Sequence, residues 1–488
     1  MNYYKKPEFV KISQIKNKHY SLHPMEHRIV PIPGRNYILL RELCDTEDVG
    51  KQIDVSEYLP FDTKYYLQTI SCMEGNIVSL QQGKNISPLT YNKSAKKLSK
   101  GNFCISRNAS IGKIAYVSND CKAIVNGGIS FFKFKDEYKY YIPAFFITNY
   151  GEDTLKCTTS GGGTQQNVKR ETLLNIKIPL PANNMNHSQE EVITYVSALV
   201  QLLIEKEMMI EKKVKKINAI IENEMKKKQS KTPYKFPTIK EIKNRGYRLD
   251  TGVYERKYKE VMNQIVSFEK GFHMIRDMEY DWISGKTPDI ILPCEKGKYW
   301  WIAVGDISYG LKFKELNRYN TAENISGKLE DGDILITRKG ATVGKMNMYF
   351  DLYNIPAFVN EDIKVLRLKE KMEEKVFIGM FLNSKYGQEQ MLNLASRGTK
   401  QGLTNENILD ICVPDFDDKV KAKIFQEYYQ NCENKREPSE PYLRYHIMRN
   451  QELGICQLNM EMFMIKRKLE RIVAQIVKQH EIQIDYML

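Results

Sequence analysis

The chain has 488 residues, which is enough for two or more domains that each bury a hydrophobic core. Its 74 Lys and Arg residues exceed its 60 Asp and Glu residues, and the net charge of +14 favours a polyanionic partner over the alternative of a basic protein without one. The nine cysteines contain no C-x-x-C pair, the N-terminal MNYYKKPEFV lacks an apolar signal segment, and no run reaches the roughly eighteen apolar residues of a membrane span. These features argue against a disulfide framework, a zinc knuckle and a membrane protein, and they predict a protein of the reducing cytoplasm.

Residues 1–182 are predicted to form a first mixed α/β module. The segment is rich in Tyr, Ile and Phe and contains short strand-like runs such as Ile129–Phe134. Within it, Gly101–Lys113 (GNFCISRNASIGK) alternates apolar residues before it reaches Ser-Arg and then Gly-Lys. This pattern is typical of a strand followed by a basic turn.

A glycine-rich loop, Thr159–Asn167 (TSGGGTQQN), precedes a strand predicted over Leu174–Pro179. Glycine lets backbone amides approach a phosphate closely, and the Thr and Gln side chains of the loop are neutral donors. The loop is therefore a candidate phosphate contact, with a plain surface loop as the alternative.

Residues 188–228 are predicted to form one long helix. Apolar residues recur at spacings of three and four from Val192 to Ile221, without proline or glycine, and Ser188 with Glu191 has the pattern of a capping box. A helix of this length would span about 60 Å, more than the core of one module requires. We therefore interpret it as a spacer, and the basic segment KKKQSKTPYKFPT that follows as a linker.

Residues 229–416 are predicted to form a second module. It contains the turn Ser284–Pro288 (SGKTP), the aromatic run Tyr299–Ile307, the stretch Gly332–Lys345 (GDILITRKGATVGK), the loop Ser396–Gln401 (SRGTKQ) and a strand over Ile411–Pro414. The adjacent Trp300 and Trp301 could stack on bases or, alternatively, belong to the core with one exposed edge. Two cations in the glycine-bearing loop suit contacts with phosphate.

A second long helix is predicted over residues 459–486, after a segment, 417–458, that contains a helical stretch and an irregular part of unknown role. Its apolar seam has the spacing of a coiled coil: Met462, Ile465, Leu469, Ile472 and Ile476. Two such helices can bury their seams by pairing in an antiparallel arrangement, and the alternative is that each packs on its own module. The predicted fold class is α+β, with two tandem mixed α/β modules separated by long helices that pair as an antiparallel coiled coil.

The second module repeats the first. Phe9, Ile12, Ile15, Lys16, Asn17, Tyr20 and Leu22 recur at a constant offset as Phe236, Ile239, Ile242, Lys243, Asn244, Tyr247 and Leu249. Gly101–Lys113 recurs as Gly332–Lys345, and Gly163–Pro179 recurs as Gly398–Pro414. The offset drifts along the chain, as expected for loops of unequal length on a shared scaffold.

With these features the chain resembles the specificity subunit of Type I restriction–modification systems, in which two target-recognition domains alternate with two long helices. The resemblance covers essentially the whole chain. It rests on the Ser284–Pro288 turn, the Trp301–Ile307 run, Gly332–Lys345, the Arg397–Gln401 loop with the Ile411–Pro414 strand, and the two helical seams. The first half departs from the pattern, because Tyr65-Tyr66-Leu67 stands where the aromatic run is expected and the S-G-x-T-P turn is missing. Residues 431–460 have no counterpart in the first half.

The resemblance implies a non-catalytic subunit, without cofactor or metal, that recognises a bipartite and asymmetric double-stranded DNA sequence. Each target-recognition domain would read one half, and the paired helices would set the gap and dock two adenine-N6 methyltransferase subunits. Translocating restriction subunits are a further partner that the resemblance allows.

The residues that we expect at the DNA belong to the two basic turns and the two glycine-bearing loops. They are cations or neutral donors suited to phosphates and base edges: Arg107, Lys113, Thr164, Gln165, Arg338, Lys339, Lys345, Arg397, Thr399, Lys400 and Gln401. For Arg107 and Arg338, a salt bridge that closes the turn is an equally good account.

No enzyme motif is complete. Gly340–Met346 resembles a Walker A loop but has three residues between its glycines instead of four, and Met346 replaces the Ser or Thr that binds magnesium. His19, His23 and His27 are spaced like ligands on a helix, but Pro24 interrupts that helix and disfavours a metal site. The chain lacks the N-P-P-Y or D-P-P-Y tetrapeptide of an amino-methyltransferase, so methylation would come from a partner.

Two alternative functions remain open at this stage. Pro414–Lys419 (PDFDDK) contains the letters of a PD-(D/E)xK nuclease, although both acidic groups lie within one turn instead of on separate strands. The first alternative is therefore a stand-alone DNA-binding nuclease with a degenerate cluster, and the second is a structured-RNA binder.

Overall fold

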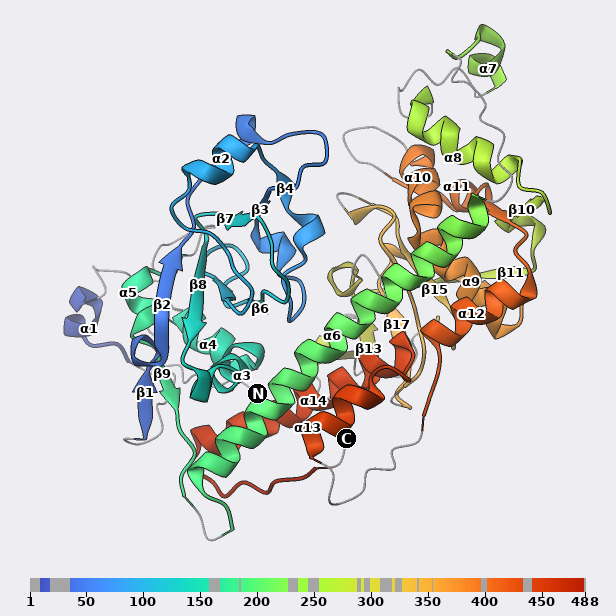
Figure 1. Cartoon of the computed structure of the whole chain (residues 1–488). Coiled ribbons are helices and arrows are strands. Elements are labelled where there is room, and N and C mark those ends of the chain that lie inside the picture. The colour runs from blue at the N-terminus through green and yellow to red at the C-terminus, as the bar shows by residue number, and fades with distance from the viewer. Residues whose placement is uncertain are drawn as a thin grey trace. The chain divides into compact units, whose positions relative to one another are not determined.

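The computed structural model describes residues 9–17, 36–157, 167–183, 186–226, 236–244, 254–287, 291–293, 299–307, 318–320, 327–339, 342–352, 354–395, 402–432 and 441–486. The chain divides into two compact units (Figure 1). The first unit comprises Met1–Met208, Lys435–Asn450 and Glu461–Leu488, and the second comprises Met209–Asn434 and Gln451–Met460. The C-terminal part of the chain therefore contributes to both units.

The first unit contains a four-stranded antiparallel sheet in the order β2-β8-β5-β6 and a three-stranded sheet in the order β4-β3-β7. The strands are β2 (Cys44–Val49), β8 (Ile129–Phe134), β5 (Phe103–Ser106), β6 (Ile114–Tyr116), β4 (Lys84–Asn85), β3 (Tyr66–Gln68) and β7 (Ala123–Val125). A separate antiparallel pair joins β1 (Tyr37–Leu39) to β9 (Lys177–Pro179). The expected strand over Ile129–Phe134 is confirmed, whereas the one expected from Leu174 begins only at Lys177, because Leu174 ends a short helix.

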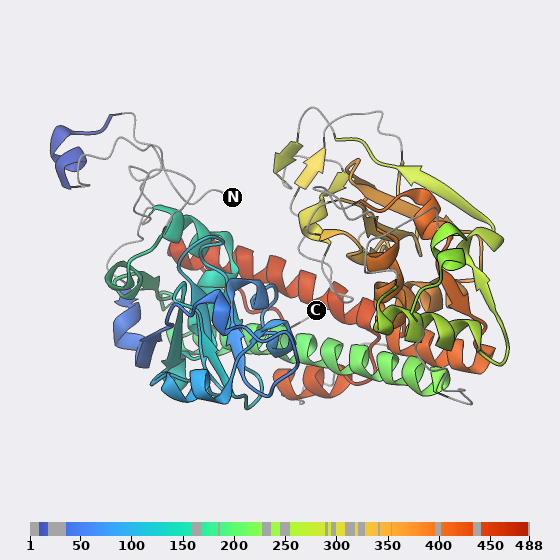
Figure 2. The ribbon, with the colours of Figure 1, turned by 90° about the horizontal axis from the view of Figure 1, so that it is seen from above.

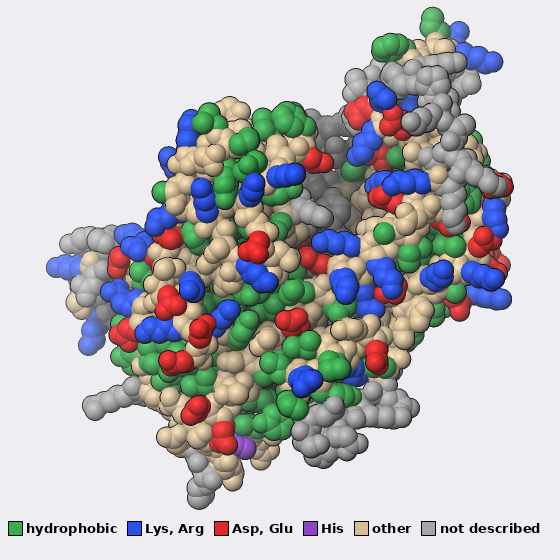
Figure 3. All heavy atoms as spheres, viewed as in Figure 1, with side chains coloured by type: hydrophobic (Ala, Val, Ile, Leu, Met, Phe, Trp, Pro, Cys, Tyr) green, Lys and Arg blue, Asp and Glu red, His purple; other side chains and the backbone are tan. Residues whose placement is uncertain are grey.

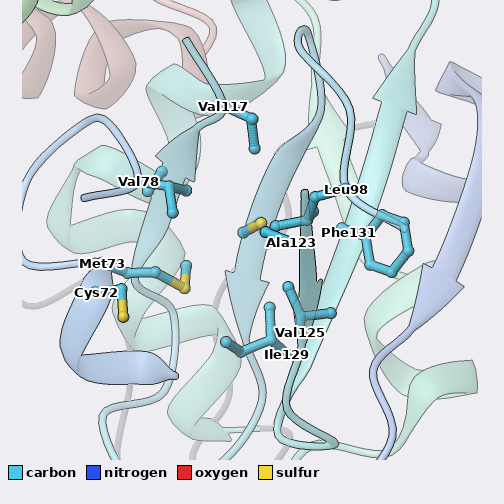
Figure 4. Packing of buried hydrophobic residues seen from close by; sticks show 11 residues of the cluster. Cys72, Met73, Val78, Leu98, Val117, Ala123, Val125, Ile129 and Phe131 are labelled. Carbon is cyan, nitrogen blue, oxygen red and sulfur yellow. The ribbon is translucent and has the colours of Figure 1, made fainter. Parts of the chain in front are cut away.

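One apolar cluster holds the two sheets of the first unit together. Side chains at alternate strand positions, such as Ile129 and Phe131 of β8 and Ala123 and Val125 of β7, point into it. Figure 4 shows the interior that these side chains share with Cys72, Met73, Val78, Leu98 and Val117. On the other face of β8, Phe132 stacks on Phe134 with ring centroids 5.4 Å apart. The strand is therefore buried on both faces except at Lys133, which is exposed, and this explains why most of its residues are apolar.

Short helices complete the first unit. They are α1 (Ile12–Asn17), α2 (Pro88–Lys93), α3 (Tyr141–Ile147), α4 (Asn149–Cys157) and α5 (Arg170–Leu174). Helix α2 begins where Ser87 Oγ accepts a hydrogen bond from Thr90 N and where Pro88 supplies the fixed φ of a first helical residue. Tyr141 OH donates to Pro179 O at 2.8 Å, so α3 is anchored to β9.

The second unit repeats the order of the four-stranded sheet as β11-β18-β15-β16, and its other sheet, β12-β14-β13-β17, has one strand more than β4-β3-β7. Its strands are β11 (Tyr280–Ser284), β18 (Ile363–Leu368), β15 (Ile334–Thr337), β16 (Met346–Met348), β12 (Ile291–Pro293), β14 (Arg318–Asn320), β13 (Tyr299–Ile302), β17 (Ala357–Val359), β10 (Phe272–Met274) and β19 (Cys412–Pro414). Strand β13 pairs in parallel with β17, as β3 does with β7, and β10 pairs with β19, as β1 does with β9. The duplication read from the sequence is therefore a duplication of the fold.

The helices of the second unit are α7 (Ile239–Asn244), α8 (Arg256–Val266), α9 (Met372–Asn383), α10 (Lys385–Leu394), α11 (Asn405–Leu409) and α12 (Asp418–Tyr428). The 3-10 helices are η2 (Leu40–Leu43), η3 (Val55–Glu57), η4 (Ile70–Cys72), η5 (Leu80–Gln82), η6 (Asp136–Tyr138), η8 (Ile275–Asp277) and η9 (Val304–Asp306). The 3-10 helix η2 follows β1, which pairs with β9, the last strand of the first module. In the same way, η8 follows β10, which pairs with β19, the last strand of the second module.

The turn that the sequence indicated only in the second half has a counterpart in the first. A Cβ on Gly50 would lie 2.2 Å from Asn126 O, and a Cβ on Gly285 would lie 2.1 Å from Val359 O. Both glycines follow the first strand of the four-stranded sheet, so Gly50-Lys51 occupies the place of Gly285-Lys286. The S-G-x-T-P sequence itself is absent from the first half, but its glycine is present there as Gly50, which approaches a backbone carbonyl as closely as Gly285 does.

Two long helices follow the modules: α6 (Gln189–Met225) and α14 (Ile455–Val477), with the shorter α13 (Tyr442–Arg449) before the second. The predicted capping box is confirmed, because Ser188 N donates to Glu191 Oε2 at 2.7 Å and Glu191 N donates to Ser188 Oγ at 3.2 Å. The last helix ends at Val477 instead of 486. Gln479 has a φ of 55° and its side-chain amide donates to Ile476 O at 2.9 Å, which terminates the helix.

The long helices run antiparallel within the first unit. Lys206 Nζ of α6 lies 2.5 Å from Glu461 Oε2 of α14, and eleven residues earlier in α6 the hydroxyl of Tyr195 donates to Asp485 O, beyond the end of α14. The seam residues Leu199, Leu203, Ile465 and Leu469 are buried. Figures 1 and 2 show α6 in green and α14 in red side by side. The predicted antiparallel pair is therefore confirmed.

The segment of unknown role, 417–458, contains more helix than expected. Helix α12 is followed by α13, and residues 433–440, which include Glu437 and Pro438 of the expected irregular part, lie outside the described residues. In the second unit, Gly454 N donates to Gln430 O at 2.7 Å, so the residue just before α14 is fixed to the end of α12.

Candidate nucleic-acid interface

The two basic turns are closed by equivalent backbone hydrogen bonds, although the second turn is one residue longer. Ser106 N donates to Lys113 O at 2.9 Å, and Thr337 N donates to Lys345 O at 2.8 Å. Gly112 and Gly344 have φ values of 87° and 79°, a conformation that glycine adopts without strain. Each turn therefore closes a β-hairpin, β5 with β6 and β15 with β16, and the glycine kept in both copies is needed for the closure.

Each hairpin is joined to the residues that follow the glycine-bearing loop. Val168 N donates to Arg107 O at 2.8 Å, and Leu403 N donates to Arg338 O at 2.8 Å. Isolated bridges pair Asn108 with Asn167 and Lys339 with Gly402. Two segments about sixty residues apart are thus brought together in both modules, as expected if turn and loop share one binding surface.

Part of the predicted site lies outside the described residues. These are the loop residues Thr164, Gln165, Arg397, Thr399, Lys400 and Gln401. Within the described residues, Arg107, Lys113, Arg338 and Lys345 are half-buried and Lys339 is exposed. The structure therefore brings the turn residues to the base of each loop, and the contacts of the loops themselves stay a prediction.

Arg107 is held by the protein's own backbone. Its Nη2 donates to Gly127 O at 2.7 Å, and its backbone N donates to Gly128 O at 2.8 Å. Burial lowers the pKa of the guanidinium, and nearby Glu47 counteracts this effect. The partner that the structure gives to Arg107 is therefore a carbonyl group between β7 and β8, and not the carboxylate of the salt bridge expected as the alternative.

The corresponding place in the second module carries two adjacent cations. Lys364, on β18, has a pKa lowered first by burial and then by the charge of Arg338. In the part of the chain that the structure describes, neither residue forms an ion pair, whereas Lys339 Nζ lies 2.8 Å from Asp362 Oδ1. An anion placed beside Arg338 and Lys364 would relieve their mutual repulsion.

Sequence analysis did not identify Lys364. The residue pairs with Ile336 in β15, and the equivalent partner of Ile105 in the first module is the buried Ser130. A lone lysine inside the otherwise apolar start of IKVLRL was the available signal, but only the sheet register places it beside Arg338. The two modules therefore present different side chains at one backbone position.

The proposed nuclease cluster is occupied by structural ion pairs. Asp415 Oδ1 lies 2.6 Å from His273 Nδ1, and Asp417 pairs with Lys270. Among the residues that the structure describes, no group of three or more His, Cys, Asp or Glu side chains could hold a metal ion. Since Asp415 is hydrogen-bonded to His273 and Asp417 is paired with Lys270, this motif gives no support to a nuclease.

The tryptophan pair belongs to the core. Trp300 and Trp301 are 2% and 6% exposed, and β13, which carries them, lies between β14 and β17. Of the two alternatives, the core is confirmed and base stacking by these side chains is wrong, because a stacking platform must be open to the base.

The surface charge is distributed and not gathered into one stripe on the face shown in Figure 3. Lys and Arg side chains (blue) are spread over both units among Asp and Glu side chains (red). The net charge therefore indicates the class of partner without locating its site.

No helix in the described part of the chain is long and apolar enough to cross a membrane.

Comparison with known proteins identifies the modules. The family model described as Type I restriction modification DNA specificity domain matches residues 49–216 and again residues 278–440. No curated protein sequence matches.

Several solved structures are similar at low identity. The S subunit of a Type I restriction–modification system from M. genitalium is 13% identical over 92% of this chain and 96% of its own, with a TM-score of 0.34. The HsdS subunit from Thermoanaerobacter tengcongensis is 12% identical over 91% and 96%, with a TM-score of 0.27. A chain from a study of complex assembly in the type I R-M system is 13% identical over 92% and 99%, also at 0.27. Because these TM-scores are low, the family assignment rests on the two matches to the family model and not on the similarity to solved structures.

Proposed function

Because the chain belongs to the family of Type I restriction modification DNA specificity domains, we propose that it reads a bipartite, asymmetric DNA sequence, one half with each module. The observation that carries this proposal is the repeated hairpin and loop junction, which has equal strand order and equal hydrogen bonds in both modules. Different side chains on the same backbone frame, such as Ser130 and Lys364, are what two unlike half-sites require. The subunit recognises DNA and has no catalytic chemistry of its own.

We assign the recognition domains to residues 1–182 and 229–416 and the spacer role to α6 and α14. The proposed DNA contacts are those of the turns and loops, with Lys364 added: Arg107, Lys113, Thr164, Gln165, Arg338, Lys339, Lys345, Lys364, Arg397, Thr399, Lys400 and Gln401. In the second module, Lys364 adds a cation at the position where the first module has Ser130.

The partners in this proposal are double-stranded DNA and two adenine-N6 methyltransferase subunits docked on the paired helices. Restriction subunits that translocate DNA would join the same assembly, in the cytoplasm. Two modules of one fold offer two equivalent surroundings, which suits two copies of one partner.

The test uses the full chain purified with the methyltransferase of its own system. Methylation should require both half-sequences on one duplex, and exchanging residues 9–180 for the same region of a relative should change one half-site and leave the other unchanged. Binding and methylation without sequence preference would contradict the proposal. An unchanged pair of half-sites after the exchange would contradict the division of labour between modules.

A further inference from the structure

A cluster of buried charged and polar side chains joins the long helices in the first unit. Lys206 of α6 is 0% exposed, and its Nζ lies 2.6 Å from Asn450 Oδ1 and 2.5 Å from Glu461 Oε2. The second carboxylate oxygen of Glu461 accepts a hydrogen bond from Arg449 Nη1. We name these four residues, Lys206, Arg449, Asn450 and Glu461, the helix-pair cluster.

The helix-pair cluster interrupts an apolar seam. Leu203 and Ile210 on α6, and Ile465 on α14, are buried on either side of it. Moving charges out of water costs free energy, and a buried ion pair often gains no net stability over apolar side chains of the same size. Its best-attested role in paired helices is to select one alignment, because sliding the helices would leave each buried charge against apolar side chains.

A second buried charge fixes the same turn of α6 to the first recognition module. Glu207 is 1% exposed, and its Oε2 accepts hydrogen bonds from the backbone N and the Nδ2 of Asn76 at 2.7 and 2.6 Å. One turn of α6 therefore contacts two parts of the first unit: Lys206 contacts Glu461 of α14, and Glu207 contacts Asn76 of the recognition module.

The helix-pair cluster also lies where the chain passes between the units. All four residues belong to the first unit. Each lies within two residues of 208/209, 450/451 or 460/461, which are three of the four places where the chain passes between the units. Both long helices thus contribute residues to both units. The axial alignment of α6 and α14 therefore bears on residues of both units.

We propose that the helix-pair cluster fixes the axial register of α6 against α14 and thereby sets the number of base pairs allowed between the two half-sites. This inference rests on the proposed function and adds the residues that determine gap specificity. Sliding by one helical turn moves a helix by about 5.4 Å, which corresponds to about one and a half base pairs of B-DNA. A helix pair without the cluster would therefore accept gaps one or two base pairs away from the preferred one.

The experiment compares methylation of duplexes that carry both half-sites at gaps from two base pairs shorter to two longer than the preferred gap. The main variant, Lys206→Met with Arg449→Met and Glu461→Leu, replaces the ion pairs by apolar side chains of similar volume. We expect its preference for the correct gap over the neighbouring gaps to fall by at least about tenfold, the equivalent of 1.4 kcal/mol, with base preference in each half-site unchanged.

Conservative variants separate register from general stability. Lys206→Arg keeps a charge for Glu461 and should retain the gap profile of the unmodified chain, whereas Glu461→Gln removes the charge with little change in shape and should broaden the profile. Lys226→Met, at an exposed lysine 3.5 Å from Glu222 on the same helix, is the matched control and should leave the profile unchanged.

The outcomes are distinguishable from those of the proposed function. If folded triple-variant protein and Glu461→Gln both keep the narrow gap profile, the register role is overturned. If the triple variant does not fold, the gap profiles of Glu461→Gln and Lys206→Arg decide the question. A Glu461→Gln profile as narrow as that of Lys206→Arg overturns the register role. A lack of sequence preference in the unmodified complex would instead overturn the proposed function, and the inference with it.

Discussion

Arg107 and Arg338 occupy the same backbone position and have different surroundings. The guanidinium of Arg107 donates to Gly127 O, whereas Arg338 lies beside Lys364 without an ion pair among the described residues. Because the hairpin hydrogen bonds are equal in the two modules, the difference comes from the side chains on the neighbouring strand. The two modules therefore share backbone hydrogen bonds at this position but differ in the charged groups that a ligand would meet there.

We expect Arg338→Gln and Lys364→Gln each to weaken DNA binding about equally on specific and unrelated sequences. If each side chain contacts a phosphate, its removal should reduce the slope of log K against log salt by about one, because one fewer counterion is released. Fluorescence anisotropy over a series of salt concentrations measures this slope. Lys369→Gln is the control, since Lys369 Nζ lies 3.3 Å from Glu279 Oε1, and an equal effect there would point to net charge alone.

The glycine turns give a stability prediction. A Cβ on Gly285 would lie 2.1 Å from the carbonyl oxygen of Val359, far inside van der Waals contact, so the backbone must move. Gly285→Ala should therefore destabilise the second unit by about 1–3 kcal/mol in urea unfolding. Gly305→Ala is the matched control, because nothing lies within 4 Å of the position of its Cβ, and equal destabilisation by both would contradict the contact.

At the scale of elements, charged side chains hold helix α6 in each of the two units. In the first unit α6 is held by Lys206 and Glu207, and in the second unit Lys213 and Lys216 both pair with Glu427 of α12. The helix is thus anchored separately to each unit by charged side chains, and its apolar seam residues, such as Leu199 and Leu203, are buried. Such anchors make the alignment of the helix sensitive to single substitutions.

Acid should weaken the helix pair through Glu461. Burial acts to raise the pKa of this carboxyl, but Lys206 and Arg449 outweigh it, and the pKa lies below the ordinary 4.5. A carboxyl with a lowered pKa in the folded state stabilises the fold above its unfolded pKa and loses this contribution as the pH falls through the folded value. The difference in unfolding free energy between the unmodified chain and Glu461→Gln should therefore be constant above about pH 5 and shrink towards pH 3.

Urea unfolding at pH values from 3 to 7 measures this difference. Glu190→Gln, at an exposed position in the first turn of α6, serves as the control and should show a small difference at every pH. A difference for Glu461→Gln that stays constant down to pH 3 would contradict the ion pair.

At the scale of the whole molecule, two recognition modules and two helices divide the work of one specificity subunit. Each module repeats one strand order, and each long helix contributes residues to both units. In the function that we propose, selectivity has separable parts: the side chains of each module determine a half-site, and the helices determine the gap between half-sites.

Inserting seven residues into α6 after Ile217 should therefore change the gap and leave both half-sites unchanged. Seven residues preserve the apolar seam and lengthen the helix by about 10 Å, which corresponds to about three base pairs. Sequencing of methylated sites in a genomic library reads half-sites and gap together. An altered base preference at an unchanged gap would show that the helix is not a spacer.

The sequence by itself determined the duplication, the fold class, the long helices and the family. These features are encoded by local periodicity and by residues with strong backbone requirements, such as Gly112 and Gly344 at positive φ and Ser188 with Glu191 at the start of α6. The helix boundaries were close, and the end of the last helix was missed because Gln479, a residue with no intrinsic preference for that conformation, adopts it through contacts with Leu180 and Ile476.

Only the tertiary structure decided which residues meet. Gly50 takes the place of Gly285 because both face a carbonyl of a neighbouring strand, and Lys364 lies beside Arg338 because sheet register, not sequence distance, places it there. The burial of Trp300 and Trp301 and the helix-pair cluster likewise depend on segments far apart in the chain. The pattern of side chains within a segment predicts the helix or strand that the segment forms. A tertiary contact depends on how two such elements are aligned, and the sequence of neither element specifies that alignment.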